Sequence, residues 1–268
     1  MTVAADFEAR RFQSAAAHYL AGRPPYPDAL IARTAQLTGL TPEDRLLDLG
    51  CGPAQLALAF APFVGAVIAM DPEPEMLRLA RAATSGAANI EVMEGRSEDL
   101  DRPEVVARLG TLKAAMIGRA FHWMDREATL DALDRLIAPG GAVVLISDEH
   151  PDIPENRRIR EYTDWIETFS VGDEVRLQRI APSYRRHPSV LLDSPFSRLE
   201  RFSVYDRRPL DLQTLTDRAL SFSSTSRARL GDKADELTAE LARRMTAWEA
   251  EGPMEEVVAS SALIAWRP

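Results

Sequence analysis

The 268-residue chain is poor in cysteine and lysine. Cys51 is its one cysteine, so no disulfide can form within the chain. There are also only four histidines, and no cluster of cysteine and histidine has the spacing of a structural zinc site. This composition is typical of the reducing cytoplasm. We therefore expect a cytoplasmic protein with no metal site.

Long apolar runs and a basic surface are missing as well. The first residues, MTVAADFEARRF, contain no apolar core of the signal-peptide type. The longest apolar run, residues 56–70, is interrupted by Pro62 and Gly65 and is shorter than the roughly 20 residues of a transmembrane helix. The net charge of -9 argues against nucleic acid as a partner. We expect neither a nucleic-acid partner nor a membrane partner.

Short apolar segments alternate with helical segments in the first 150 residues. We expect strands at residues 45–50, 66–71, 90–95, 114–121 and 142–147. We expect helices at residues 7–20, 28–37, 54–62, 74–83 and 126–137, the last one capped by Asp125. Strands that are apolar on both faces and alternate with helices predict a parallel sheet covered on both sides.

The regular alternation stops after residue 150. Residues 151–195 are rich in arginine, and we interpret them as a partly helical insertion over the carboxyl edge of the sheet. Strand character returns in SRLERFSVYDRRPL and in the final EVVASSALIAWRP, which predicts an antiparallel hairpin that closes the sheet. An apolar stripe between them predicts an amphipathic helix over residues 232–248.

Carboxylates and glycines stand where the first two strands end. Asp48, Gly50 and Gly52 follow the first strand in LLDLGCGPA, and Asp71 ends the second. Ligands of a parallel sheet bind beyond these strand ends. The loop lacks the third glycine of the dinucleotide fingerprint and the lysine of a phosphate-binding loop. Since a carboxylate attracts an ammonium group and accepts hydrogen bonds from ribose hydroxyls, the pattern favours S-adenosylmethionine.

A family resemblance is carried by YLAGRPPYP, LLDLGCGPAQLA, VIAMDPEPEMLRLAR, VMEGRSEDL and GRAFHWMDREATLDALDRLIAPGGAVVLI. With these segments the chain resembles class I S-adenosylmethionine-dependent methyltransferases. It is most similar to the small-molecule branch that includes trans-aconitate methyltransferase. The resemblance is strong over residues 19–147 and continues in order, more weakly, to the C-terminus.

The resemblance implies one α/β domain over residues 1–268, Rossmann-like and doubly wound. Its mostly parallel seven-stranded sheet would carry the C-terminal antiparallel hairpin and a helical lid insertion. The expected parts are N-terminal lid helices (1–40), a cofactor-binding core (41–150), a substrate-lid insertion (151–195) and a C-terminal part of the core (196–268).

The resemblance also implies a cofactor site. Asp48 and the two glycines would lie along the methionine part of S-adenosylmethionine, while Asp71 would hold the ribose. Ala54 replaces a glycine common in the class, and Arg96 stands where an adenine-contacting aspartate is often found, so adenine would be read mainly by the backbone and Ser97. The cofactor-binding residues expected are Tyr19, Arg23, Asp48, Gly50, Cys51, Gly52, Gln55, Asp71, Pro72, Met76, Arg96, Ser97, Gly118 and Arg119.

His122, directly after the fourth strand, is the expected catalytic residue. A neutral imidazole can take a proton from a hydroxyl or ammonium acceptor during methyl transfer. A carboxylate acceptor needs no base, and His122 would then orient the substrate. For the basic SYRRHP segment, residues 183–188, local salt bridges and a clamp for an acidic substrate are both open. The substrate-binding residues expected are Tyr26, His122, Trp123, His150, Trp165, Tyr184 and Arg185.

The sequence therefore predicts an enzyme that methylates a hydroxyl, carboxylate or amine of a small organic molecule, in natural-product tailoring on compositional grounds. The alternative is a fold relative that binds S-adenosylmethionine without turnover, as a regulator or partner subunit. The missing glycine and the absence of a Tyr-x-x-x-Lys pair argue against a dehydrogenase. "GRAF" stands where nucleic-acid methyltransferases carry an Asn/Asp-Pro-Pro-aromatic motif. We expect a monomer or a homodimer.

Overall fold

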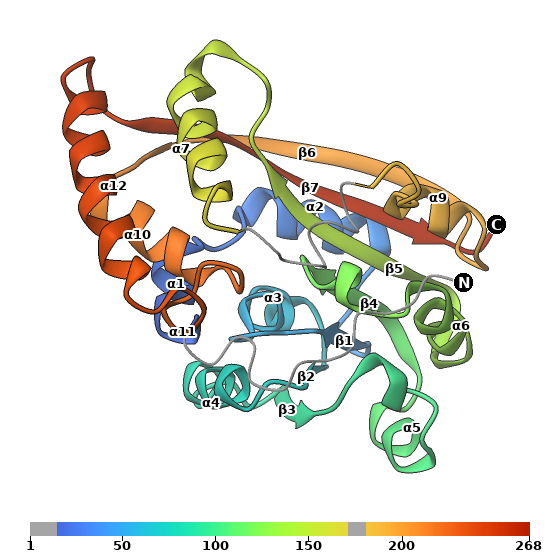
Figure 1. The fold of residues 1–268 in the computed structure, drawn as a ribbon. Coiled ribbons are helices and arrows are strands. Elements are labelled where there is room, and N and C mark those ends of the chain that lie inside the picture. The colour runs from blue at the N-terminus through green and yellow to red at the C-terminus, as the bar shows by residue number, and fades with distance from the viewer. Residues whose placement is uncertain (1–14, 171–180) are drawn as a thin grey trace.

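Seven strands form one sheet in the order β3-β2-β1-β4-β5-β7-β6. The computed structural model describes residues 15–170 and 181–268. β1 to β5 run parallel, whereas β7 lies antiparallel between β5 and β6 (Figure 1). The predicted mostly parallel sheet with an antiparallel C-terminal pair is thereby confirmed. The strands are β1 (Arg45–Leu49), β2 (Ala66–Asp71), β3 (Ile90–Glu94), β4 (Leu112–Gly118), β5 (Ile137–Glu149), β6 (Arg198–Pro209) and β7 (Glu255–Trp266).

Two strand boundaries differ from the prediction. β4 ends at Gly118, because Arg119 adopts a positive φ of 59° and turns the chain. β5 begins five residues earlier than expected, at Ile137, so the APGG segment, residues 138–141, lies inside the strand. The register of β4 and β5 shifts between Leu112 and Ala114, which accommodates the extra residues of β5 as an irregularity of the ladder.

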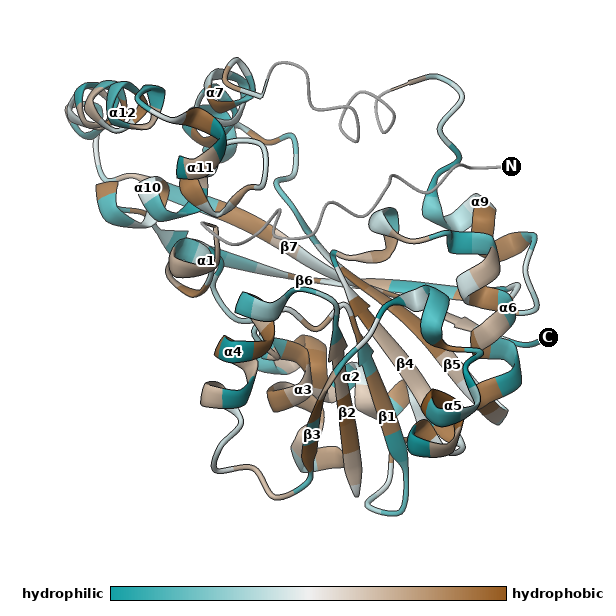
Figure 2. Cartoon of the chain, turned by 60° about the horizontal axis from the view of Figure 1, so that its bottom comes forward, coloured by the Kyte–Doolittle hydropathy of each residue, from teal (hydrophilic) through white to brown (hydrophobic). Residues whose placement is uncertain are grey.

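Helices cover both faces of the sheet. Alternate strand residues supply the two faces, with Leu46 and Val67 on one and Leu47 and Ile68 on the other. The first face packs against α2, α3 and part of α4, and the second against α5, α6 and α9 (Figure 2). These helices are α2 (Asp28–Thr38), α3 (Gln55–Phe60), α4 (Pro74–Ala83), α5 (Pro103–Leu109), α6 (Arg126–Leu136) and α9 (His187–Leu192).

A further group of helices forms a helical cap with its own apolar core. The group consists of α1 (Ala16–Gly22), α7 (Arg157–Glu167), α10 (Leu212–Ser221), α11 (Arg227–Leu230) and α12 (Lys233–Glu249). The predicted stripe on α12 is buried against α7 and α10. It comprises Ala234, Leu237, Leu241, Met245 and Trp248. Of the predicted helix over residues 7–20, the part before residue 15 lies outside the described residues.

The insertion predicted over residues 151–195 divides between two places. α7 packs in the helical cap, whereas α9 packs beside α6 at the other end of the sheet (Figure 1). Residues 171–180 of this stretch lie outside the described residues. None of the helices in residues 15–170 and 181–268 is long and apolar enough to cross a bilayer.

Candidate functional site

The loop between β1 and α3 turns through the left-handed region three times. The φ angles are 71° at Gly50, 53° at Gly52 and 66° at Ala54. For alanine this conformation costs roughly 1–2 kcal/mol, so the position that the class often fills with glycine is a strained one here. The Gly50 and Cys51 N–H groups both donate to Met70 O, at 2.8 and 3.0 Å, which ties the loop to β2.

Gly52 faces open space on the ligand side of this loop. Among the described residues, a Cβ on Gly52 would meet only the Tyr19 hydroxyl, at 4.0 Å. A Cβ on Gly50, in contrast, would lie 2.5 Å from the Ala120 Cβ. The loop is therefore closed toward the turn after β4 and leaves a ligand room to approach the Gly52 backbone.

The Asp71 carboxylate is hydrogen-bonded to this loop. Oδ2 accepts the Gly52 N–H at 2.8 Å, and Oδ1 accepts the Glu73 N–H at 2.9 Å. Burial raises the pKa of Asp71 to about 6, although both backbone hydrogen bonds favour the ionised form. Each oxygen has a second lone pair, so Asp71 can also accept hydrogen bonds from a pair of ligand hydroxyls.

Asp48 is the second buried carboxylate, and only 1% of its surface is exposed. Its Oδ2 accepts the Ala57 N–H at 2.9 Å and so fixes the first turn of α3 to β1. Burial raises the pKa of Asp48 to about 7, with the Ala57 hydrogen bond opposing the rise and the charge of Asp71 adding to it. A cationic group bound at the loop would stabilise the ionised form of Asp48.

α1 and the residue after it bring Tyr19 and Arg23 to the same loop. The Arg23 guanidinium lies 4.9 Å from the centre of the Tyr19 ring and equally far from that of Phe222. Arg23 Nε donates to Ser221 Oγ at 3.2 Å, and Gln55 Nε2 donates to Arg23 O at 3.0 Å. Four residues of the predicted cofactor site, Tyr19, Arg23, Gln55 and Gly52, are therefore neighbours in space.

α1 reaches this position because it is fixed to α10. His18 Nδ1 lies 2.6 Å from Asp217 Oδ1. Gly22 packs so closely that a Cβ there would lie 2.4 Å from the Arg218 backbone nitrogen. A helix from the start of the chain and one from its last quarter thus form a single wall of the site.

The end of β4 forms a second wall of the site. The Arg119 guanidinium lies 5.1 Å from the centre of the Tyr26 ring and donates to Asp148 Oδ2 at 2.6 Å. The Arg119 N–H donates to Ile146 O at 3.1 Å, so the backbone group that Arg119 can offer to a cofactor is its carbonyl. A Cβ on Gly118 would lie 2.8 Å from the Tyr26 hydroxyl, which places the Tyr26 side chain directly over this strand end.

The residues predicted near adenine differ in burial. Met76 and Ser97 are buried, and the Ser97 hydroxyl donates to Glu98 Oε2 at 3.2 Å. The Arg96 side chain is 43% exposed and lies 3.5 Å from the same carboxylate, so it extends along the surface. Pro72 follows the end of β2 directly.

Burial raises the pKa of the Cys51 thiol well above its ordinary value, which makes Cys51 a packing residue of the loop.

His122 and Trp123 lie in the short helical turn Phe121–Trp123 that follows β4. Their ring centres are 4.8 Å apart. The residues on both sides, Ala120 and Met124, are the ones that a Cβ on Gly50 would meet. The turn that carries His122 thus lies next to the glycine loop.

Two of the other predicted substrate contacts have structural partners. His150 Nε2 lies 2.7 Å from Glu256 Oε2, and both terminal nitrogens of Arg218 donate to the same carboxylate, at 2.6 and 2.8 Å. Burial alone would raise the pKa of Glu256, but these partners lower it to about 2. Trp165 packs in the helical cap, under the Arg244 guanidinium at 4.8 Å. The structure does not bring Trp165 to the turn that holds His122.

Tyr184 and Arg185 lie against the start of α6, where sequence reasoning missed a residue. Arg185 donates to Glu127 Oε1 at 2.8 Å and pairs with Asp193, so local salt bridges do form in SYRRHP. Arg126 is only 3% exposed and donates to Arg185 O at 2.6 Å. A basic residue in the first turn of a helix, where acidic residues are preferred, is the signal that could have identified Arg126.

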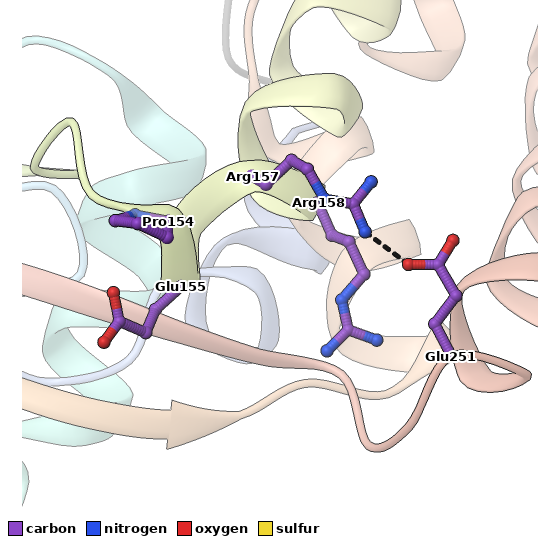
Figure 3. A pocket seen from close by; sticks show the side chains of 5 residues that line it. All are labelled: Pro154, Glu155, Arg157, Arg158 and Glu251. Atoms are coloured by element: carbon purple, nitrogen blue, oxygen red, sulfur yellow. Dashed lines mark hydrogen bonds and ion pairs between the residues drawn. The ribbon is translucent and has the colours of Figure 1, made fainter.

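Two cavities in the described part of the chain lie away from these loops. The larger, about 470 Å³, is in the helical cap and is lined by Thr168, Phe169, Ser170, Ser224, Arg229, Leu230, Lys233 and Glu236. The smaller, about 210 Å³, is lined by Pro154, Glu155, Arg157, Arg158 and Glu251 (Figure 3). There Arg157 pairs with Glu251, which joins α7 to the turn after α12. Neither cavity contains a predicted site residue, and no group suited to hold a metal ion occurs in residues 15–170 and 181–268.

Comparisons with known proteins find similarity to methyltransferases. Residues 46–141 match the model of a methyltransferase domain, which spans both carboxylates, the glycine loop and His122. An uncharacterized methyltransferase of Mycobacterium tuberculosis is 28% identical over 243 residues, covering 83% of this chain and 81% of that protein. A demethylmenaquinone methyltransferase of Lactococcus lactis is 31% identical over 46% of this chain and 47% of its own.

Solved structures of low sequence identity share the fold. A candidate type II methyltransferase of Anaeromyxobacter dehalogenans aligns with a TM-score of 0.60 at 23% identity, over 91% of this chain and 97% of that one. An S-adenosylmethionine-dependent methyltransferase of Geobacter sulfurreducens, solved with S-adenosylhomocysteine, aligns with a TM-score of 0.52 at 16% identity, over 97% and 99%. The chain therefore shares the Rossmann-like fold of these structures.

Proposed function

We propose that this chain, which is an S-adenosylmethionine-dependent methyltransferase, transfers the methyl group to a hydroxyl, carboxylate or amine of a small organic molecule. S-adenosylmethionine is its cofactor. The observation that carries the proposed site is the Asp71 carboxylate, which accepts the N–H of Gly52 beneath a backbone face that is open to a ligand.

The residues present fit the cofactor part by part. We assign the methionine part to the loop of Gly50 and Gly52, with Asp48 facing the ammonium group. Asp71 would accept hydrogen bonds from the ribose hydroxyls through its second lone pairs. Arg23, held between two aromatic rings at the end of α1, supplies a cation for the methionine carboxylate.

The protein contributes alignment and proton handling to the reaction. When bound, the cofactor supplies a methyl group activated by its sulfonium. The turn after β4 would hold the acceptor in line with that methyl group and shield both from water. His122 would take the proton of a hydroxyl or ammonium acceptor, with Tyr26 and Trp123 lining the same mouth.

Several finer statements belong to the same proposal. We divide the single domain into lid helices (1–40), cofactor core (41–150), substrate lid (151–195) and C-terminal core (196–268). The enzyme would belong to the small-molecule branch that includes trans-aconitate methyltransferase. Its reaction would be a step of natural-product tailoring. We expect the enzyme in the cytoplasm, as a monomer or homodimer.

Calorimetric titration of the purified protein tests the proposal. S-adenosylmethionine should bind, and NADH, which also has ribose hydroxyls but carries a pyrophosphate, should not. Binding of NADH alone, or of neither compound, would contradict the proposed site. Binding of S-adenosylmethionine without turnover across a broad acceptor screen would favour the alternative of a non-catalytic regulator or partner subunit.

A further inference from the structure

Arg126 is a buried cation without an acidic partner among the described residues. It is the first residue of α6, and only 3% of its surface is exposed. Its Nη1 donates to Arg185 O at 2.6 Å and lies 3.4 Å from His187 Nδ1. Its Nη2 has no hydrogen-bond partner among the described residues. No carboxylate in this part of the chain lies within salt-bridge distance of the guanidinium.

The carboxylates closest in sequence are engaged elsewhere. Asp125 caps α6, with Oδ1 accepting the Ala128 N–H at 3.1 Å. Glu127 accepts from Arg185 at 2.8 Å, and Asp193 pairs with the same guanidinium. The local acidic residues therefore neutralise the half-buried Arg185 and leave the fully buried Arg126 with its charge.

This arrangement is unfavourable for stability alone. A buried charge is costly unless it is paired, and a cation at a helix N-terminus opposes the helix dipole. The Tyr184 ring, 4.6 Å from the guanidinium, offsets part of that cost through a cation–π contact. A bound anion would remove the rest, because it pairs with the guanidinium and also interacts favourably with the helix N-terminus.

A second donor stands at the same place. The Tyr184 hydroxyl is buried and has no hydrogen-bond partner among the described residues. Two aromatic contacts surround the donors, since the His187 ring packs edge-on against Phe121 at 5.2 Å and against Tyr184 at 6.4 Å. The polar atoms without partners thus lie in a setting that favours a flat organic anion over a hydrated inorganic one.

We propose that Arg126 Nη2 and the Tyr184 hydroxyl bind a carboxylate of the methyl acceptor. This inference rests on the proposed function and narrows it to acceptors that carry a carboxylate. The link to the reacting atoms is the turn after β4, which carries both Phe121 and His122. Phe121 contacts His187 of the subsite, and Ala120, on the other side of Phe121, lies next to the Gly50 position of the glycine loop. Two donors match the two oxygens of a carboxylate, so the subsite favours a carboxylate over a phosphate.

Paired aromatic probes of equal shape test this subsite. Benzoate and benzamide differ in charge and match the aromatic surroundings, and inorganic phosphate is the third probe. Each is titrated calorimetrically into protein saturated with S-adenosylhomocysteine. Wild-type protein should bind benzoate about tenfold more tightly than benzamide, a difference of about 1.4 kcal/mol.

Three variants assign the effect to residues. Arg126→Met should abolish the preference for benzoate, while Arg186→Met, the matched control at an exposed arginine of the adjacent segment, should retain it. Tyr184→Phe should weaken benzoate binding about threefold to tenfold with no loss of thermal stability, because the hydroxyl that it removes is buried without a partner. Tyr184→Phe decides the case if Arg126→Met does not fold.

The outcomes separate the two proposals. The subsite would be overturned by equal binding of benzoate and benzamide to the wild type, or by tighter binding of phosphate than of benzoate. It would also be overturned by an undiminished preference for benzoate in Arg126→Met, or by unchanged benzoate affinity in Tyr184→Phe. If S-adenosylmethionine still binds in the same preparation, the proposed function survives that result. If S-adenosylmethionine does not bind, the proposed function itself fails.

Discussion

The two halves of the candidate site consist of different kinds of chemical group. The cofactor half, formed by the loops after β1 and β2, consists of backbone N–H groups and two buried carboxylates that accept them. The proposed acceptor half, formed by the turn after β4 and residues 181–193, consists of side chains around a buried guanidinium that has no acidic partner in the described part of the chain. The hydrogen bonds described in the cofactor half have both partners within the protein. The proposed acceptor half contains donors that a ligand would satisfy.

The difference explains how one fold can serve many acceptors. Backbone geometry and the carboxylates that hold it leave little freedom for change, whereas side chains on a turn and on a neighbouring segment can vary without disturbing the sheet. Changes in the cofactor half should therefore lower cofactor affinity. Changes in the acceptor half should lower turnover or acceptor affinity and leave the cofactor bound.

The largest expected effect is that of His122→Ala. If His122 takes the acceptor's proton, turnover should fall by about 100-fold or more, because general-base catalysis contributes factors of this size. Affinity for S-adenosylmethionine should stay within about twofold of wild type, since the loop that faces the turn contacts Ala120 and Met124. Steady-state kinetics with the identified acceptor, together with calorimetry, measure both quantities. Equal losses in both would make His122 a structural residue and would erase the distinction between the halves.

Asp71→Ala should have the next largest effect, on cofactor binding. The change removes the acceptor of the Gly52 and Glu73 N–H groups and the predicted ribose contacts. Hydrogen bonds to charged groups contribute about 1.5–3 kcal/mol each, so affinity should fall by about 100-fold. Asp211→Ala is the control, because Asp211 also accepts a backbone N–H, from Thr214 at 2.7 Å, but lies at the start of α10. Calorimetry showing unchanged affinity in Asp71→Ala would contradict the assigned role.

The sequence predicts the cofactor half better than the acceptor half, for the same physical reason. The cofactor half depends on strands, glycines and strand-end carboxylates, which leave local patterns in the sequence. The structure has β1 and β2 where those patterns predict them. The resemblance implies that Tyr19 belongs to the cofactor site, and the structure puts its hydroxyl 4.0 Å from the Cβ position of Gly52. The helix–helix contact that holds it, between α1 and α10, spans almost 200 residues and leaves no local pattern.

The acceptor half depends on such long-range contacts throughout. Arg126 and Tyr184 meet only because α6 and the segment before α9 pack together, so their proximity cannot be derived from either segment alone. Trp165 and Tyr184 belong to one arginine-rich stretch of sequence, yet the fold sends them to opposite ends of the sheet. The amino-acid composition identifies residues 151–195 as unusual. It does not show that one part of this stretch packs in the helical cap and another beside α6.

Acidification from pH 7.5 to pH 5 should lower the affinity for S-adenosylmethionine by at least about tenfold, the loss expected from protonation of Asp71 alone. Burial raises the pKa of Asp48 to about 7 and that of Asp71 to about 6, so both become protonated in the free protein over this range. The ammonium and ribose contacts need the ionised carboxylates, and binding must therefore release protons. Calorimetry in two buffers of different ionisation enthalpy would reveal that release. Affinity that is constant from pH 7.5 to pH 5 would show that neither carboxylate faces the cofactor.

The smallest effect comes from a pair of matched glycine substitutions. Gly39 and Gly52 both have positive φ, 62° and 53°, and a Cβ on Gly39 would meet no described atom within 4 Å. Gly39→Ala and Gly52→Ala should therefore lower stability by a similar amount, about 1 kcal/mol, because the backbone strain is the same. Only the methyl group at position 52 projects toward the cofactor, and it should weaken binding by about tenfold. Thermal denaturation and calorimetry on the two variants separate strain from contact. An equal loss of affinity in both would mean that the Gly52 backbone face, open as it is, does not receive the ligand.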